Sequence, residues 1–519
     1  MSIIKKIGCL SIGIVLALGL SLTGCQQPGS EVNNTGDNKT EANKTDTGKK
    51  SENKKEKVLN CYFLAPQCKD ITLVEEAINK ITQEKIGAKV KLNYFFWDSY
   101  QEQQRLAIAS EKPIDIMFAP SWWGYANYVA QQAFLPLDDL LQQYGKDIID
   151  NIHPAYLEAP KIDGKLYAIP TGKDMAGVGG VLVNKALADK YNFDLSTLKK
   201  PEDFEPMLKI IKENEPGVVP FLSVQLDISS YFVQDFYENI IQKEVPIGIK
   251  KTNDGKPTVY NMCETPEYIR IVKLAYDWYK KGYINNDAAT LKDGMPIKNA
   301  QKAFMWPEQL KPGKAEEMRA QLGYEVVQVN AYADLKPFST TGDLTNSMLV
   351  IPRASENPDE AMMLMNLMFS DKELKNLFSW GIEDKHYKKI AENQIDFADG
   401  VDANTSGYSG IAQWAMGGNQ FLDYLWASEN PDKWDRMKEF NDSAIISNTL
   451  GFTYNQQAVK TEIAALAAVG NEYGTPLGAG VVDYDKHYPK MKQALKDAGI
   501  DAVLKDAQEQ LDKFLAEKK

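Results

Sequence analysis

The sequence Ile114-Asp115-Ile116-Met117-Phe118-Ala119 has the composition of a short buried strand, and it completes a pattern that begins at Val58. A strand-like apolar run at 58–64 comes first, followed by helical spacing over 70–86 and an alternating strand over 88–95. A second helical segment, 99–110, precedes the quoted strand. The order β-α-β-α-β predicts an α/β fold in which helices cover a sheet.

Aromatic side chains cluster directly after two of these strands. Trp97 and Tyr100 follow the strand at 88–95, and Trp122, Trp123 and Tyr125 follow the strand at 114–119. Ligands in layered α/β sheets bind beyond the carboxyl ends of the strands. We therefore expect a binding surface rich in tryptophan at this edge of the sheet.

Further strand patterns occur at 164–170, 177–184, 324–329 and 347–351. The length of 519 residues favours two or more lobes, and the chain between the first two of these strands is expected to cross from one lobe to the other. The glycine-rich segment 177–180 imitates a phosphate-binding loop weakly, and we interpret it as a tight strand. From Asp371 onward we expect mainly helix, closing with a helix over 488–518.

The composition excludes several classes of function. A net charge of −12 argues against nucleic acid and anionic lipid surfaces as partners. Three histidines and an odd set of cysteines after the N-terminal segment, Cys61, Cys68 and Cys263, match no metal-site spacing. We expect no metal and no cofactor. A Cys61–Cys68 disulfide is conceivable, and the sequence does not decide it.

An enzyme would need a recognisable catalytic arrangement. The chain has no Gly-x-Ser-x-Gly turn, and its many acidic residues form no pattern typical of the paired carboxylates of a glycosidase. The sequence therefore favours a binding protein over an enzyme.

The N-terminal residues have the features of an export signal. Lys5 and Lys6 precede a charge-free run, 7–22, which is shorter than the roughly 20 apolar residues of a membrane-spanning helix. The run ends in Leu22-Thr23-Gly24-Cys25, which resembles a bacterial lipobox. We expect residues 1–25 to be a lipoprotein signal peptide and Cys25 to carry the lipid. Residues 26–57 are almost devoid of apolar side chains and are expected to form a disordered tether.

Several short motifs occur in a specific order along the remaining chain. They include Phe134–Leu141 (FLPLDDLL), Gly164–Pro170 followed by Val183-Asn184-Lys185, and Asn357–Ala361 (NPDEA). In this order they resemble the motifs of the extracellular solute-binding proteins of ABC sugar importers. The run 376–387 (NLFSWGIEDKHY), with 418–421, 440–444 and 462–465, resembles the lipoprotein LipO-like subgroup, although Asp384 stands where that subgroup usually has Gly.

The resemblance implies a two-lobe periplasmic-binding-protein-like fold of type II, with a hinge between the lobes and a helix-rich C-terminal part. We assign 58–170 to the first part of the N-terminal lobe, 171–325 to the C-terminal lobe, 326–370 to the second part of the N-terminal lobe, and 371–519 to a helical LipO-like region. Such lobes close around a solute, and the closed state is the one that a permease recognises.

The function implied is capture of an oligosaccharide between the lobes and its delivery to the permease subunits of an ABC importer. We expect a monomer held by its lipid at the outer face of the cytoplasmic membrane, on the periplasmic side if an outer membrane exists. Two alternatives stay open. The solute could be a peptide, or the protein could present its solute to a signalling system, because all three functions use the same binding body.

Sugars offer flat C–H faces and a rim of hydroxyl groups, so their sites need aromatic surfaces and planar polar groups. On this basis we predict the following ligand-binding residues: Trp97, Trp122, Trp123, Lys173, Asp174, Trp306, Glu308, Trp380, Trp414 and Asn419. Because Trp122 and Trp123 are adjacent, we expect one of them to face the cleft and the other to pack. Trp306 is predicted to lie in a loop.

Overall fold

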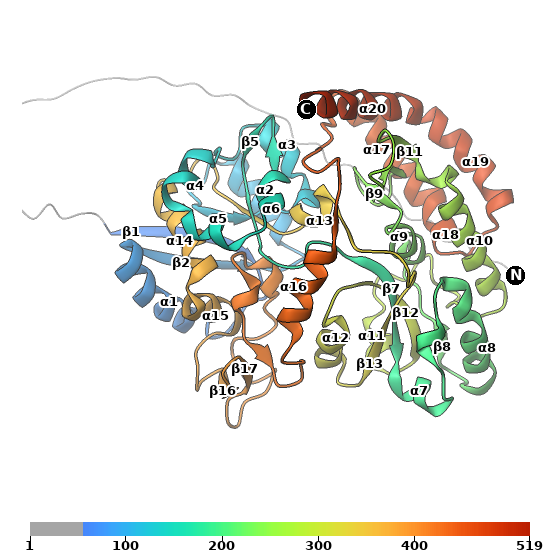
Figure 1. Cartoon of the computed structure of the whole chain (residues 1–519), viewed down its shortest axis with the longest axis horizontal. Helices are drawn as coiled ribbons and strands as arrows, with labels where there is room; N and C mark the ends of the chain where they lie inside the picture. Colours follow the sequence, from blue (N-terminus) through green and yellow to red (C-terminus); the bar gives the residue numbers. More distant parts are fainter. Residues whose placement is uncertain (1–55, 519) are drawn as a thin grey trace, which may run out of the picture. The chain divides into compact units, whose positions relative to one another are not determined.

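The computed structural model describes residues 56–518, so the predicted signal peptide, Cys25 and nearly all of the tether lie outside the described residues. Two large hydrophobic cores organise the described chain, and two smaller clusters accompany them. Lobe 1 is built around the core formed by residues 59–175 and 344–416. Lobe 2 is built around the core formed by residues 181–331 and 452–511. Figure 1 shows lobe 1 around β1 and β2 and lobe 2 around β7 and β12.

The sheet of lobe 1 has the strand order β2-β1-β3-β15-β6. Its parallel strands are β1 (Lys57–Leu64), β2 (Ala88–Phe95) and β3 (Ile116–Phe118). The predicted helices between them are α1 (Ile71–Ile86) and α2 (Tyr100–Ala109). Strand β15 (Met348–Val350) returns antiparallel between β3 and β6 (Ile169–Pro170). The β-α-β-α-β prediction is thus confirmed, and the carboxyl ends of β2 and β3 lie at one edge.

Lobe 2 contains a second sheet with the order β13-β7-β12-β8. Its strands are β7 (Val178–Asn184), β8 (Val219–Phe221), β12 (Ala303–Leu310) and β13 (Val326–Asn330). The helices α8 (Glu205–Asn214), α9 (Asp227–Val233) and α10 (Pro266–Lys280) belong to this lobe. A small antiparallel sheet of β9 (Tyr237–Asn239), β10 (Ile247–Lys250) and β11 (Val259–Asn261) completes it.

The glycine-rich segment forms part of strand β7, as predicted. Close packing of neighbouring elements explains why the strand needs glycine. A Cβ atom at Gly179 would lie 1.8 Å from the carbonyl oxygen of Tyr231, and one at Gly180 would lie 2.5 Å from that of Val329. Only glycine lets α9 and β13 approach the strand this closely.

The C-terminal residues 371–518 are divided between the two lobes. Helix α15 (Lys372–Trp380) and a three-stranded sheet of β16 (Tyr387–Ala391), β17 (Gln394–Phe397) and β18 (Leu425–Trp426) lie beside lobe 1. This sheet interrupts the region that the sequence predicted to be mainly helical. Its strands have five, four and two residues, which is too short for an alternating pattern to identify them in the sequence.

The final helices pack on lobe 2. They are α17 (Lys460–Val469), α18 (Thr475–Gly478), α19 (Tyr484–Asp497) and α20 (Ile500–Glu517), and they appear in red in Figure 1. Helices α18 and α19 contact α10, and α20 contacts β11. The single closing helix predicted over 488–518 is two helices. Gly499, with φ of +88°, separates them in a left-handed conformation that a non-glycine residue adopts at a cost.

Three chain segments connect the lobes at 171–177, 332–340 and 441–451. Strands β14 (Phe338–Ser339) and β19 (Ile445–Ile446) from two of them pair in parallel. The Ser339 hydroxyl donates to the Met175 carbonyl at 2.6 Å, and the Asn441 amide donates to the Lys173 carbonyl at 2.8 Å. Side-chain hydrogen bonds therefore join all three connections into one hinge.

Candidate functional site

The fold brings four of the predicted tryptophans together at the carboxyl edge of the lobe 1 sheet. Trp97 follows β2, Trp122 and Trp123 form a 3-10 turn after β3, and Trp414 comes from a distant segment. The indole centroid of Trp97 lies 6.0 Å from that of Trp122 and 6.0 Å from that of Trp414. Trp97 is 46% exposed and Trp122 is 45% exposed. We call these four side chains the aromatic patch.

The two adjacent tryptophans have different surroundings. Trp123 stacks on Tyr100 with a centroid distance of 5.4 Å and meets Phe118 edge-on. Trp122 stacks on Trp97 and donates its indole N–H to the carbonyl oxygen of Asn346 at 3.0 Å. Trp122 is thus the exposed member of the pair, and Trp123 is the member that packs against the lobe.

Lys173 and Asp174 lie in the first lobe connection and are buried. The Lys173 ammonium is 3.0 Å from the Asp174 carboxylate, and Lys311 approaches the same carboxylate at 3.4 Å. Burial by itself would raise the pKa of Asp174, but the two lysines hold it well below its usual range. The charges continue through Glu317, Lys433 and Glu429. Both predicted residues therefore already have charged partners within the hinge.

Trp306 and Glu308 lie within strand β12 rather than in a loop. Trp306 is 1% exposed and belongs to a smaller apolar cluster of lobe 2 with Leu182 and Met318, and the Lys298 ammonium lies 5.2 Å from the centre of its ring. Strand β12 runs between β7 and β8, and Phe304 and Met305 are buried as well as Trp306. The run of apolar residues is typical of a strand covered on both faces. The structure does not bring Trp306 to the aromatic patch.

Glu308 belongs to a charged cluster of lobe 2. Its carboxylate is 3.4 Å from the Lys314 ammonium. Asp227, at the start of α9, has its pKa raised to about 6, mainly by burial and also by the nearby Glu308, although Lys298 opposes this. Sequence reasoning missed Asp227 and Lys298, because only the fold brings them beside Glu308.

Trp380 and Asn419 are separate from the aromatic patch. Trp380 packs edge-on against Trp426 at 5.2 Å, within the small cluster beside β16 to β18. Asn419 is largely buried and forms a backbone bridge with Gly172. Its side-chain oxygen accepts from the N–H of Phe421 at 3.1 Å. Both side chains therefore support local structure in this conformation.

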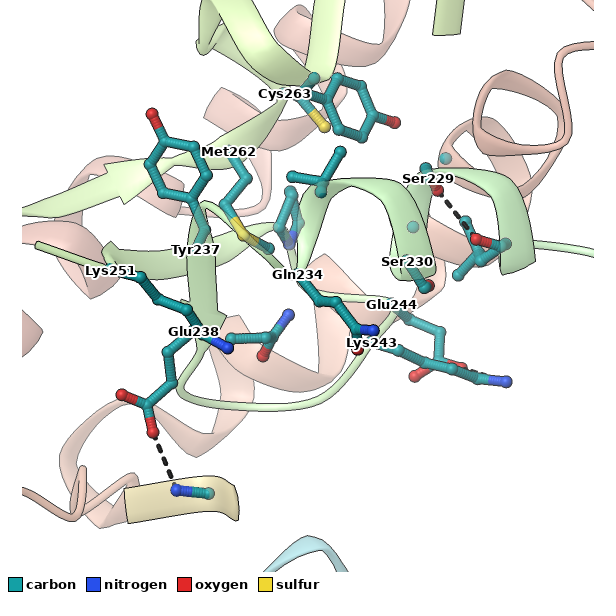
Figure 2. A pocket seen from close by; sticks show the side chains of 18 of the residues that line it. Ser229, Ser230, Gln234, Tyr237, Glu238, Lys243, Glu244, Lys251, Met262 and Cys263 are labelled. Carbon is teal, nitrogen blue, oxygen red and sulfur yellow. Dashed lines mark hydrogen bonds and ion pairs between the residues drawn. The ribbon is translucent and has the colours of Figure 1, made fainter. Parts of the chain in front are cut away.

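A cavity of about 280 Å³ opens between lobe 2 and helix α13 (Thr341–Thr345), and Figure 2 shows its lining. Val233, Met262 and Met491 contribute apolar walls, while Gln234 and Glu238 contribute polar groups. We call it the α13 cavity. No sequence motif indicated it, because its walls come from segments far apart in the sequence: α9, β9, α10, α13, the π-helix Gly470–Gly474 and α19.

Other classes of site find little support in the described residues. Across residues 56–518, no group of three or more His, Cys, Asp or Glu side chains is arranged to hold a metal ion. Cys61, Cys68 and Cys263 are free thiols. No helix in the same range is long and apolar enough to cross a membrane.

Two lobes, a three-segment hinge and an exposed aromatic surface define a protein that binds a solute. The family described as bacterial extracellular solute-binding proteins matches residues 76–382, and the chain belongs to this family. It is accordingly a binding protein of a transport family and not an enzyme. Residues 448–516 also match a domain of unknown function, DUF3502.

Individual relatives extend the match to most of the chain. A carbohydrate ABC transporter substrate-binding protein of Streptococcus pneumoniae serotype 4 (strain ATCC BAA-334 / TIGR4) is 30% identical over 445 residues, which cover 85% of this chain and 87% of that protein. The crystal structure of the N-glycan transport solute binding protein NgtS from Streptococcus pneumoniae covers 89% of this chain and 100% of its own, at 27% identity and a TM-score of 0.80. The same protein in complex with Man5GlcNAc covers the same shares at 28% identity and a TM-score of 0.72.

Proposed function

We propose that this protein captures an oligosaccharide between its two lobes and delivers it to the permease of an ABC importer. The observation that carries the proposal is the aromatic patch, which offers two half-exposed indole rings at the edge of the sheet where ligands of layered α/β folds bind. Indole faces are large and apolar and suit the C–H faces of sugar rings. The relative that transports N-glycans supports the choice of an oligosaccharide.

The lobe arrangement supports a mechanism by closure. The three connections are joined by hydrogen bonds, so the lobes can rotate about one hinge while their separate cores stay intact. A ligand that contacts both lobes only when they are closed shifts the population toward the closed state. The permease then selects the loaded form.

Membrane attachment through Cys25 is part of the proposal. The lipobox-like sequence at 22–25 and the polar segment that follows support a lipid anchor with the binding lobes outside the cell. The partners are then the oligosaccharide and the permease subunits.

Isothermal titration calorimetry with the purified protein tests the ligand class. The panel consists of Man1GlcNAc, Man5GlcNAc, maltose oligosaccharides, fructose oligosaccharides and a mixed set of short peptides. We expect binding of one oligosaccharide family and none of the peptides. Binding of peptides alone would retain the fold and contradict the sugar assignment.

A further inference from the structure

The α13 cavity contains polar groups that the fold leaves available. The side-chain nitrogen of Gln234 is buried and has no hydrogen-bond partner among the described residues. One carboxylate oxygen of Glu238 accepts the backbone N–H of Gly342 at 2.9 Å, a contact visible in Figure 2. Buried amide donors are normally hydrogen-bonded, and one without a partner destabilises the folded protein. The lone donor of Gln234 therefore marks a position where a ligand acceptor would be stabilised.

The remaining walls are suited to a compact polar molecule with an apolar face. Val233, Met262 and Tyr268 supply apolar and aromatic surface. Lys251 lies 3.8 Å from Asp343, and both residues line the cavity, so both signs of charge are present. The volume of about 280 Å³ is just below the range of about 300–1,000 Å³ that whole drug-sized ligands occupy. The cavity fits a fragment of an oligosaccharide rather than the whole molecule.

Helix α13 links the cavity to the aromatic patch. At its C-terminal end, the carbonyl of Asn346 accepts the indole N–H of Trp122. Near its N-terminal end, the N–H of Gly342 donates to Glu238 in the cavity. These two backbone positions are four residues apart, which corresponds to about 6 Å along an α-helix. The aromatic patch and the cavity therefore lie at opposite ends of this one short helix.

We propose that the α13 cavity is a terminal subsite that binds one end of the oligosaccharide. Hydroxyl groups of the terminal sugar donate to Glu238 and accept from Gln234, while its C–H face packs on Val233 and Met262. The subsite rests on the proposed function, and it makes the protein selective for ligands long enough to reach both places.

The protonation state of Glu238 is consistent with this role. Burial raises the pKa of Glu238 to about 7, with Asp343 contributing, while the N–H of Gly342, Lys251 and Thr340 oppose the shift. Lys243 and Glu244 also line the cavity. Near neutral pH the carboxyl group can therefore act as donor or acceptor, and sugar hydroxyls satisfy either form.

The test compares a short and a long ligand in calorimetric titrations of the full protein. The variants are Glu238→Leu and Gln234→Leu, which each remove the hydrogen-bonding groups, and the matched control is Glu213→Leu, at an exposed carboxylate on α8. We expect each cavity variant to weaken Man5GlcNAc about tenfold and Man1GlcNAc less than twofold, since loss of one well-placed hydrogen bond is worth about tenfold. The control should bind both as the unchanged protein does.

The outcomes separate the two proposals. Unchanged affinity of both cavity variants for Man5GlcNAc, or an equal loss for both ligands, would overturn the terminal subsite while leaving sugar binding intact. Failure of the unchanged protein to bind either glycan would instead contradict the proposed function for this ligand family, and the subsite with it. Thermal melting checks folding, and Gln234→Leu carries the test if Glu238→Leu does not fold.

Discussion

At the scale of single residues, Trp122 and Trp123 show how two identical side chains acquire different tasks. Trp123 contacts Tyr100 and Phe118 beneath it, whereas Trp122 is 45% exposed. We predict that Trp123→Ala lowers the free energy of unfolding by about 2–3 kcal/mol, because it leaves a cavity over Tyr100. Trp122→Ala should change it by less than about 1 kcal/mol. Urea denaturation measures both, and equal losses would contradict the assignment of Trp123 as the packing member.

The raised pKa of Glu238 predicts how the stability of the protein depends on pH. Its folded-state pKa of about 7 lies above the ordinary glutamate value, so the folded protein retains this proton to higher pH than the unfolded chain does. The contribution of Glu238 to the free energy of unfolding is therefore lost as the pH rises from about 4.5 to about 7. The loss from this group is at most about 3 kcal/mol.

Asp235, whose pKa burial also raises to about 7, acts in the same direction. Glu238→Gln should accordingly reduce the decline in the urea midpoint between pH 5 and pH 7.5. Glu213→Gln serves as the control. A decline of the same size in Glu238→Gln and the unchanged protein would show that Glu238 does not titrate in this range.

At the scale of elements, strand β7 depends on glycine more than on apolar residues. A methyl group at position 179 would overlap the carbonyl oxygen of Tyr231 at the end of α9. Gly179→Ala should therefore destabilise the protein by more than about 2 kcal/mol. In Gly294→Ala, the nearest atoms are the flexible ends of Val224 and Leu222 at 3.2–3.3 Å, so a smaller loss is expected. Thermal melting of both variants would contradict this account if their losses were equal.

Several elements could be predicted from the sequence because their signals are local. Strand β2 has a regular alternation and was predicted with its observed bounds, 88–95, and α1 ends at Gly87 in the left-handed conformation. The aromatic residues after β2 and β3 could be located because sheet topology alone brings these strand ends together.

Other features could not be predicted because they depend on distant contacts. The strand containing Trp306 is covered on both faces, which removes the alternation that would identify it. The polar groups of the α13 cavity, Gln234 and Glu238, stand in no motif, and their unusual environment arises only when α13 is placed against lobe 2. That each predicted tryptophan contacts the ligand remains a prediction.

At the scale of the whole molecule, both lobes are assembled from discontinuous chain. Residues 452–511 complete the core of lobe 2, although the segments before them belong to lobe 1. The hinge must therefore be made of three connections, and this arrangement permits rotation of the lobes without disrupting either core.

Membrane attachment is also a property of the whole molecule. If Cys25 carries a lipid, Cys25→Ser should move most of the protein from the membrane fraction of the host cell to a soluble or secreted fraction. Cys9→Ser, within the same predicted signal, is the matched control and should leave attachment unchanged. Immunoblotting of the fractions gives the readout, and a Cys25→Ser protein retained at the membrane would contradict a lipid on this residue.

Binding of the oligosaccharide by the aromatic patch can be measured by one calorimetric comparison. The Trp97→Ala/Trp122→Ala protein is titrated with the glycan that binds the unchanged protein best, beside Leu73→Ala, a similarly exposed apolar residue on α1. We expect a loss of affinity of at least a hundredfold in the double variant, from two stacking contacts of about 1.5 kcal/mol each, and none in the control. A double variant that melts normally and binds the glycan as tightly as the unchanged protein would contradict it.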